Sequence, residues 1–309
     1  MREELKMSDF NKSVAVVSHD AGGAEVLSSY IKQHNIHCNY CLAGPALKIF
    51  QRKLGDIKII SSKEAIDHSD SLLCSTSWQS DLEWESIKIA RKCNKKSIAF
   101  LDHWGNYRER FIRNGEASWP DEVWVGDSEA EILANKVLPE VIVKQIENPY
   151  FAEIKRELNV IAKSSIRHKN ELSLLFVSEP LREHGIKGFG NELHWGYTEE
   201  EGLHYLLSNL YVFNNKVGRI VIRPHPSEAI DKFDWASNEY SLPIENGGRK
   251  TLLEEIVECD VVVGFQSMAL VVGVLAGKRV ISCIPEGGKA CSLLQPEIEY
   301  LQFLVSAHC

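Results

Sequence analysis

The chain has 309 residues, of which 44% are apolar and 25% charged, enough for two globular domains with separate cores, and this composition excludes a disordered protein. Its formal net charge of −8 disfavours a broad, sequence-independent hold on nucleic acid phosphates, so no nucleic acid partner is expected. The N-terminus is charged without an apolar stretch of signal-peptide length, and the longest nearly apolar run, 261–277, is shorter than the roughly 20 residues of a membrane span. The sequence therefore predicts a cytoplasmic protein.

The first half of the chain repeats a strand followed by a helix. Nearly continuous β-branched runs predict strands, and the segments between them show helical spacing of apolar residues, which is typical of a parallel sheet covered by helices. The predicted strands are 13–19, 38–44, 57–62, 71–77, 96–102 and 122–127, and a further helix is predicted at 128–137. The sequence therefore predicts a doubly wound, Rossmann-like domain at residues 1–150.

The loop after the first predicted strand reads "SHDAGGAEVL" and contains His19, Asp20, Gly22 and Gly23. It does not match the GxGxxG pattern, so a dinucleotide site is not predicted. Glycines would still let a ligand approach the backbone closely, because they have no side chain.

A denser group of polar and aromatic residues follows the strand at 96–102. Asp102, His103 and Trp104 end this strand, and Tyr107 and Arg108 follow. Acid–base chemistry uses carboxylate and imidazole groups, so the segment is a candidate active site. A structural cluster of ion pairs and aromatic rings is the alternative. Lesser candidates after other strands are Asp81, Glu83, Asp127 and Ser128.

The eight cysteines are scattered, mostly inside apolar runs, where a reduced thiol behaves as a small apolar group. Cys38 and Cys41 are spaced like half of a zinc site, but no second pair lies at a matching distance. The sequence therefore predicts neither a disulfide framework nor a structural metal.

An Asn-Pro turn at 148–149 and a charged helical segment at 152–163 separate a second strand–helix series from the first. Its predicted strands are 171–180, 218–226, 240–246, 260–267 and 278–285, and its predicted helices are 198–213, 251–257 and 268–276. These elements predict a second Rossmann-like domain at residues 151–309. Two such domains are expected to face each other across a cleft at the carboxyl ends of their strands.

The stretch "IVIRPHPSE" at 220–228 ends a predicted strand in polar groups. Arg223 and His225 each precede a proline, which favours extended backbone and should project both side chains on one side. If a helix starts at "SEAID", its free N–H groups near Ser227 and Glu228 add an anion site. An ordinary helix cap with a hydrogen-bonded histidine is the alternative.

A second anion site is predicted where "VVVGFQSMAL" passes from a strand into a helix. Gly264 permits a tight strand end, Gln266 and Ser267 supply donors, and Met268 begins the helix. An ordinary N-cap at Ser267 is the alternative.

Three further polar residues end strands in this half of the chain, namely Ser178, Glu179 and Glu245. Either glutamate could hold the hydroxyl groups of a ribose, and either could equally be a solvated turn residue.

These features together resemble the GT-B glycosyltransferases. The closer resemblance is to the bacterial capsule and lipopolysaccharide group with a His-Pro motif, which includes polysialyltransferases, Kdo transferases and CDP-glycerol polymerases. The resemblance implies that His225 and Ser267 contact the donor phosphates, and that the acceptor binds the N-terminal domain near Gly22, Gly23, Trp104, Tyr107 and Arg108. It implies Asp102 or His103 as the base, with Asp20 and His19 next. No Asp-x-Asp motif is present, so no metal or other cofactor is implied.

The function expected from this resemblance is metal-independent glycosyl transfer in the synthesis of capsule or lipopolysaccharide. The partners would be a nucleotide-sugar donor, with a CMP-linked acidic sugar favoured, and a saccharide or lipid-linked acceptor. A lipid-linked acceptor would bring the protein to the inner membrane peripherally. A nucleotide-sugar 2-epimerase or hydrolase, and a non-catalytic two-domain protein that binds a sugar or nucleotide, are the alternatives.

Overall fold

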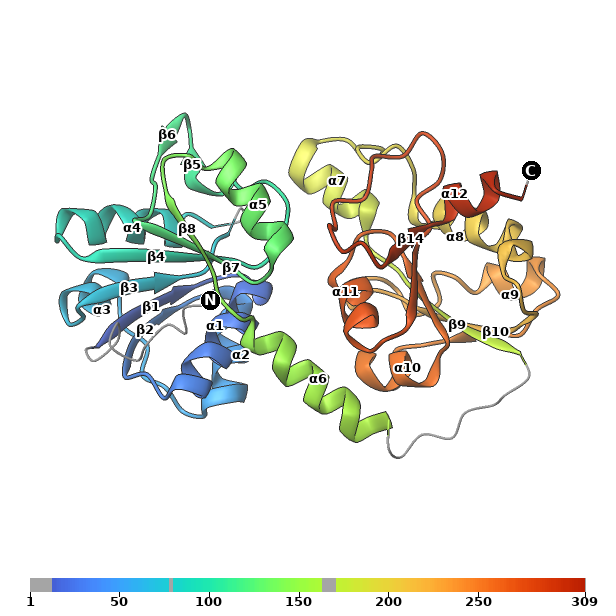
Figure 1. Ribbon diagram of the computed structural model, residues 1–309, viewed down its shortest axis with the longest axis horizontal. Coiled ribbons are helices and arrows are strands. Elements are labelled where there is room, and N and C mark those ends of the chain that lie inside the picture. The colour runs from blue at the N-terminus through green and yellow to red at the C-terminus, as the bar shows by residue number, and fades with distance from the viewer. Residues whose placement is uncertain (1–12, 78–79, 163–170, 309) are drawn as a thin grey trace. The chain divides into compact units, whose positions relative to one another are not determined.

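The computed structural model describes residues 13–77, 80–162 and 171–308 (Figure 1). The chain divides into two compact units, Met1–Glu153 and Ile154–Cys309. Each unit contains one six-stranded parallel sheet covered by helices.

In unit 1 the strands lie in the order β2-β1-β3-β4-β7-β8. Every adjacent pair is parallel, so the carboxyl ends of all six strands lie along one edge of the sheet. The strands are β1 (Val14–Ser18), β2 (Cys38–Leu42), β3 (Ser71–Cys74), β4 (Lys96–Leu101), β7 (Glu122–Val125) and β8 (Ile142–Gln145).

Helices cover both faces of the unit 1 sheet because consecutive residues of its central strands are apolar, and consecutive side chains point to opposite faces. Val14 and Val16 of β1 pack with apolar residues of α1 and α2 in one buried cluster. The helices are α1 (Ala21–His34), α2 (Gly44–Leu54), α3 (Ser62–Asp67), α4 (Leu82–Lys92) and α5 (Ser128–Val137), and a small hairpin joins β5 (Ile112–Arg113) to β6 (Glu116–Ala117).

Two edge segments of unit 1 differ from the prediction. The strand predicted at 57–62 is wrong, since only Ile59 forms an isolated bridge, with Tyr40 of β2. Ile59 is exposed, and charged neighbours prevent the segment from burying a continuous apolar face. Strand β8 was not predicted, because it is a short edge strand with little buried surface.

In unit 2 the strands lie in the order β11-β10-β9-β12-β13-β14, again all parallel. The strands are β9 (Leu172–Val177), β10 (Val217–Arg223), β11 (Ile244–Asn246), β12 (Val261–Gly264), β13 (Arg279–Ser282) and β14 (Ile298–Tyr300). The sequence predicted the first five of these, and the sixth is a three-residue edge strand.

The helices of unit 2 surround a core in which Phe176, Phe233 and Phe265 meet edge to face. Capping boxes at Thr198 and Thr251 begin two of these helices, because each threonine and the glutamate three residues later satisfy each other's N–H groups. The helices, together with the one that starts in unit 1, are α6 (Pro149–Ala162), α7 (Leu181–Phe189), α8 (Glu199–Ser208), α9 (Trp235–Glu239), α10 (Leu252–Glu258), α11 (Met268–Leu275) and α12 (Leu301–Ser306).

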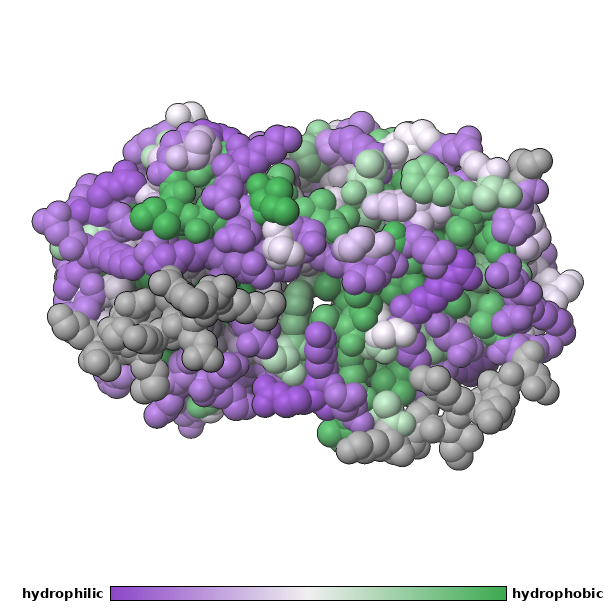
Figure 2. All heavy atoms as spheres, in the orientation of Figure 1, coloured by the Kyte–Doolittle hydropathy of each residue, from purple (hydrophilic) through white to green (hydrophobic). Residues whose placement is uncertain are grey.

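Most side chains on the surface seen in Figure 2 are hydrophilic, with apolar groups gathered in smaller patches. Across residues 13–77, 80–162 and 171–308, no helix has both the length and the apolar character required to cross a membrane.

Candidate functional site

Three loops of unit 1 meet at the carboxyl edge of its sheet. Strands β1, β3 and β4 are neighbours, so the loops that follow them lie side by side. These loops carry most of the residues that the sequence singled out in the first half of the chain.

His19 and Asp20 form a hydrogen-bonded pair at this edge. Nδ1 of His19 lies 2.7 Å from Oδ1 of Asp20, and the hydroxyl of Ser77 donates to the same oxygen at 2.8 Å. A carboxylate accepts the Nδ1 proton, which leaves Nε2 of the neutral imidazole as the position with a lone pair. The face of the ring lies against Gly44, where a Cβ would be 2.7 Å from Nε2 and 2.9 Å from Cε1. The loop therefore presents an oriented imidazole.

Glu83 of α4 holds the backbone of this loop by hydrogen bonds. One of its carboxylate oxygens accepts the backbone N–H of His19 at 2.7 Å and the hydroxyl of Ser75 at 3.0 Å, and Ser75 in turn contacts Ser18. The side chain is buried, and burial raises the pKa of Glu83. The sequence ranked Glu83 as a lesser candidate, and the structure gives it the role of fixing the backbone of His19.

Asp102 lies in a different set of contacts. Its carboxylate pairs with Arg110 at 3.0 Å, and the same guanidinium nitrogen donates to Thr76 at 2.7 Å. A Cβ on Gly22 would lie 2.0 Å from the other oxygen of Asp102, so this glycine permits the approach of the carboxylate to the start of α1. Gly23 is similarly packed against Ser75. Both glycines thus serve close packing within the protein.

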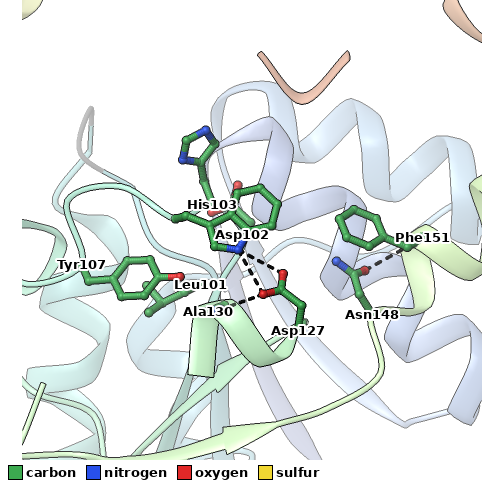
Figure 3. A pocket seen from close by; sticks show the side chains of 10 residues that line it. Leu101, Asp102, His103, Tyr107, Asp127, Ala130, Asn148 and Phe151 are labelled. Atoms are coloured by element: carbon green, nitrogen blue, oxygen red, sulfur yellow. Dashed lines mark hydrogen bonds between the residues drawn. The ribbon is translucent and has the colours of Figure 1, made fainter. Parts of the chain in front are cut away.

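His103 lines a small pocket together with Tyr107 and Asp127 (Figure 3). Its Nδ1 accepts the N–H of Gly105 at 3.2 Å, which places the proton of the neutral ring on Nε2. Burial lowers the pKa of His103, so the ring is neutral at physiological pH. The pocket has a volume of about 10 Å³, roughly enough for one water molecule and too small for a sugar.

Trp104 and Arg108 are held by structural contacts. The indole N–H of Trp104 donates to the Asp127 carboxylate at 3.0 Å, and Asp127 also caps α5. The guanidinium of Arg108 makes two hydrogen bonds to Glu140, at 2.8 and 2.9 Å, and lies over the ring of Trp119. These contacts match the structural alternative considered for this segment.

In unit 2 the neighbouring strands β10, β9 and β12 bring three other loops together at the carboxyl edge. Glu228 links two of them. Its carboxylate accepts the N–H of His225 at 2.7 Å and the hydroxyl of Ser178 at 3.2 Å, and it pairs with Lys232 at 2.7 Å. The expected helix at "SEAID" is wrong, because these contacts hold 226–234 as a series of turns. No helix N-terminus therefore adds an anion site at Ser227.

His225 is partly exposed at the end of β10. Its Nδ1 accepts the backbone N–H of Ser227 at 3.2 Å and lies 2.9 Å from the hydroxyl of that residue. This geometry puts the proton of the neutral ring on Nε2. The ring centroids of His225 and His184 lie 6.3 Å apart in an edge-on arrangement. The pKa of His184 is lowered by burial and by His225.

Arg223 and His225 have different hydrogen-bond partners. Its guanidinium pairs with the buried carboxylate of Glu255 at 2.7 Å and donates to the carbonyl of Lys250 at 2.9 Å. Glu255 also accepts the N–H of Gly248. Arg223 therefore ties β10 to α10 and the loop before it. Glu245 is exposed and pairs only loosely, at 3.5 Å, with Arg219.

The junction of β12 and α11 contains Gln266, Ser267 and Met268, as predicted. Ser267 occupies the N-cap position, but its side chain makes no capping hydrogen bond. The N–H of Gln266 donates to Glu179 at 2.7 Å, and its side-chain oxygen accepts the hydroxyl of Ser292 at 3.0 Å. Burial raises the pKa of Glu179 to about 7, although the N–H of Gln266 acts in the opposite direction.

The sequence reasoning missed a charged cluster next to the loop of His225. Lys232 contacts Glu199 at 3.2 Å as well as Glu228, and Arg182 pairs with Glu199 at 3.1 Å. The side chain of Glu199 is only 2% exposed. The three consecutive glutamates at 199–201 are typical of a solvated helix start, so no sequence pattern indicated this cluster. Within the described ranges, no three His, Cys, Asp or Glu side chains are grouped to hold a metal ion.

No protein-family model matches the chain, and a search of the curated proteins finds no match. Solved structures do match over nearly the whole chain, and they place it in the class of two-domain α/β proteins with the GT-B fold. The predicted fold class, two Rossmann-like domains of the GT-B kind, is thus confirmed.

Particular structures with this fold include a UDP-GlcNAc 2-epimerase from Methanocaldococcus jannaschii, with 10% identity and a TM-score of 0.58 over 96% of this chain and 91% of the other. The Anabaena protein Alr3699/HepE in complex with UDP has 12% identity and a TM-score of 0.57 over 96% and 90%. An α/β-galactoside α-2,3-sialyltransferase from Photobacterium phosphoreum has 10% identity and a TM-score of 0.51 over 95% and 100%. At these identities the likeness shows the fold alone.

Proposed function

We propose that the protein is a metal-independent glycosyltransferase that uses a nucleotide-sugar donor. Unit 2 would bind the donor, and unit 1 would bind a saccharide or lipid-linked acceptor in the synthesis of capsule or lipopolysaccharide. The similar fold of a sialyltransferase and of a protein solved with UDP supports this class of substrate. A CMP-linked acidic sugar is the first donor to test, because the sialyltransferase transfers an acidic sugar.

The observation that carries the proposal is the geometry of His225. The residue is partly exposed at the carboxyl end of a parallel strand, where open α/β sheets bind ligands. Its Nδ1 is held by Ser227, so Nε2–H is the group that the ring can donate to a ligand. Glu228 fixes the backbone of this loop. A donor phosphate contacted by Nε2–H would be stabilised as the glycosidic bond breaks.

For the base, the contacts in unit 1 favour His19 over Asp102 and His103. Asp102 is paired with Arg110, and Nδ1 of the partly buried His103 already accepts a hydrogen bond. His19 instead has an imidazole oriented by Asp20, with Nε2 as the acceptor position. A general base requires a positioned lone pair within reach of the proton that it removes.

The proposed reaction moves the sugar from the donor phosphate to the acceptor hydroxyl. Nε2 of His19 takes the proton of the acceptor hydroxyl while the acceptor oxygen forms a bond to the anomeric carbon of the sugar. The bond from that carbon to the donor phosphate oxygen breaks, and the nucleotide leaves with the electron pair. His225 donates a hydrogen bond from Nε2 to the charge that develops on the phosphate. Asp20 stabilises the imidazolium that forms.

A nucleotide-sugar 2-epimerase or hydrolase is the second candidate, favoured by the fold similarity to a UDP-GlcNAc 2-epimerase at a TM-score of 0.58. The two functions differ in their products. A transferase needs a separate acceptor, whereas the second candidate forms an epimer or a free sugar from the donor alone. Product analysis of the purified protein with donor and no acceptor distinguishes them.

The first experiment is a thermal-shift screen with CMP, CDP, UDP, GDP and dTDP on the wild type, on His225→Ala and on the control His308→Ala. Ligands that bind the folded state raise its melting temperature. We expect one nucleotide to stabilise the wild type and the control but not His225→Ala, because His308 is exposed in the last turn of the chain. Equal stabilisation of all three proteins would refute the assigned role of His225, and no stabilisation of any would refute the nucleotide-sugar function.

A further inference from the structure

The N-terminus of α11 already binds a carboxylate of the protein itself. An oxygen of Glu179, in the loop after β9, accepts the N–H of Gln266 at 2.7 Å. The backbone N–H groups of Phe265 and Ser267 also favour the charged form of this carboxylate. Free N–H groups at a helix N-terminus are the groups that commonly bind phosphate. Glu179 therefore occupies the positions that a phosphate at α11 would need.

The hydroxyl of Ser267 gives a second, independent indication that a ligand oxygen belongs at this place. Its Oγ is buried, and no hydrogen-bond partner is found for it among the described residues. The side chain does not cap α11, although serine at an N-cap usually does so. Buried hydroxyl groups in folded proteins are nearly always hydrogen-bonded. A phosphate oxygen at the start of α11 would satisfy this hydroxyl.

The surroundings of Glu179 make its negative charge easy to remove. Burial is the main cause that raises the pKa of Glu179 to about 7, and the carboxylate of Glu228 raises it further. The other titratable groups that face Glu179 are Tyr197, Cys283 and Cys291, whose pKa values are raised and which are neutral at pH 7. Lys232, which pairs with Glu228, is also bound to the glutamates of α8.

We infer that Glu179 is an internal competitor of the donor phosphate at the N-terminus of α11. Phosphate binding displaces its carboxylate from the N–H groups, and the displaced carboxylate takes up one proton from solvent. This inference rests on the proposed nucleotide-sugar function, and it makes Glu179 a determinant of donor affinity. The sequence suggested a different role, in which Glu179 holds ribose hydroxyls, and the two roles predict opposite effects of removing its charge.

The competition between Glu179 and phosphate should increase with pH. Below pH 7 Glu179 is largely protonated in the free protein, so a phosphate meets little competition. Above pH 7 each binding event must also take a proton from solution, so the affinity falls by up to about tenfold per pH unit. The titration of the phosphate contributes equally in a variant that differs only at Glu179.

The test measures the dissociation constants of CMP and UDP by calorimetry at pH 6, 7 and 8 for wild type, Glu179→Gln and the control Glu192→Gln. Glu192 lies in an exposed loop, so its variant removes one charge elsewhere in unit 2. We expect Glu179→Gln to bind about tenfold more tightly than wild type at pH 8 and equally at pH 6. The control should follow the wild type. Calorimetry in HEPES and in Tris should show less proton uptake by Glu179→Gln than by wild type.

Three results would overturn the inference. Weaker binding by Glu179→Gln would mean that the carboxylate contacts the ligand, as in the ribose role. Equal affinities and equal proton uptake would mean that no displacement occurs. No binding of either nucleotide to wild type or variant would refute the proposed function itself, and the inference with it. If Glu179→Gln does not fold, Glu179→Ala gives the same comparison, because it also removes the competing charge.

Discussion

Substitution of Gly44 by alanine should both destabilise unit 1 and displace the imidazole of His19. Gly44 has a φ of +52°, and a Cβ there would lie 2.7 Å from Nε2 and 2.9 Å from Cε1 of His19. A non-glycine residue in the left-handed region costs about 1–2 kcal/mol. The imidazole cannot move away without losing the hydrogen bond to Asp20, which adds about 1 kcal/mol.

The loop that contains Gly44 cannot easily withdraw. The N–H of Ala43 donates to the carbonyl of Ser18, and the N–H of Ala46 donates to the carbonyl of His19, each at 3.1 Å. Gly44→Ala should therefore lower the free energy of unfolding by about 2–3 kcal/mol. Displacement of the ring from its oriented position should reduce turnover by about 10²-fold or more.

Gly190→Ala is the matched control for this substitution. Gly190 has a φ of +66° at the end of α7, and a Cβ there meets no atom within 4 Å. The control should show only the backbone cost, about 1–2 kcal/mol, and should keep its activity. Urea unfolding and initial rates with the donor found in the screen measure both effects. If Gly44→Ala is no less stable than the control and is fully active, His19 is not the oriented base described above.

Three further predictions concern buried charges. Burial raises the pKa of Glu83, so folding favours its protonated form, and this contribution to stability is lost as pH rises through the folded-state pKa. In urea unfolding, Glu83→Gln should therefore lose less stability than wild type between pH 5 and pH 8. Parallel pH profiles of the two proteins would contradict this. Glu228→Gln removes a charged acceptor from three donors, so the free energy of unfolding should fall by about 1–3 kcal/mol and nucleotide binding should weaken. Unchanged binding would mean that Glu228 does not position His225. Arg223→Met leaves the buried carboxylate of Glu255 without its cation, so the melting temperature should fall while the nucleotide-induced shift in melting temperature remains. Loss of that shift without loss of stability would instead mean that Arg223 binds the nucleotide-sugar donor.

The sequence was sufficient to predict the central strands of both sheets, because strands buried on both faces read as continuous apolar runs. β1 and β12 are fully buried, and both were predicted. The edge strands β8 and β14 bury little and are short, so they have no such pattern. Helix α7 was missed because glycines at positions 185 and 188 weaken its helical signal.

The candidate site was predictable in part. Chain order and sheet order together place the loops after β1 and β4 at one edge, so His19 and Asp102 were both candidates from the sequence. Which of them is held by a cation depends on Arg110, whose position follows from the fold of the intervening loop. The contact between Glu179 and the start of α11 joins residues 87 positions apart. No local pattern in the sequence encodes such a contact.

The hydrogen bonds between the three loops of unit 1 have a consequence for how this edge opens. Ser18, Ser75 and Glu83 join the loop after β1 to the loop after β3 and to α4, and Thr76 joins that loop to Arg110. Opening one loop therefore breaks the contacts of the others, and the loops should open as one cooperative unit. Their backbone amides should exchange with deuterium at a common rate, and substitution at Glu83 should accelerate exchange in all three loops together.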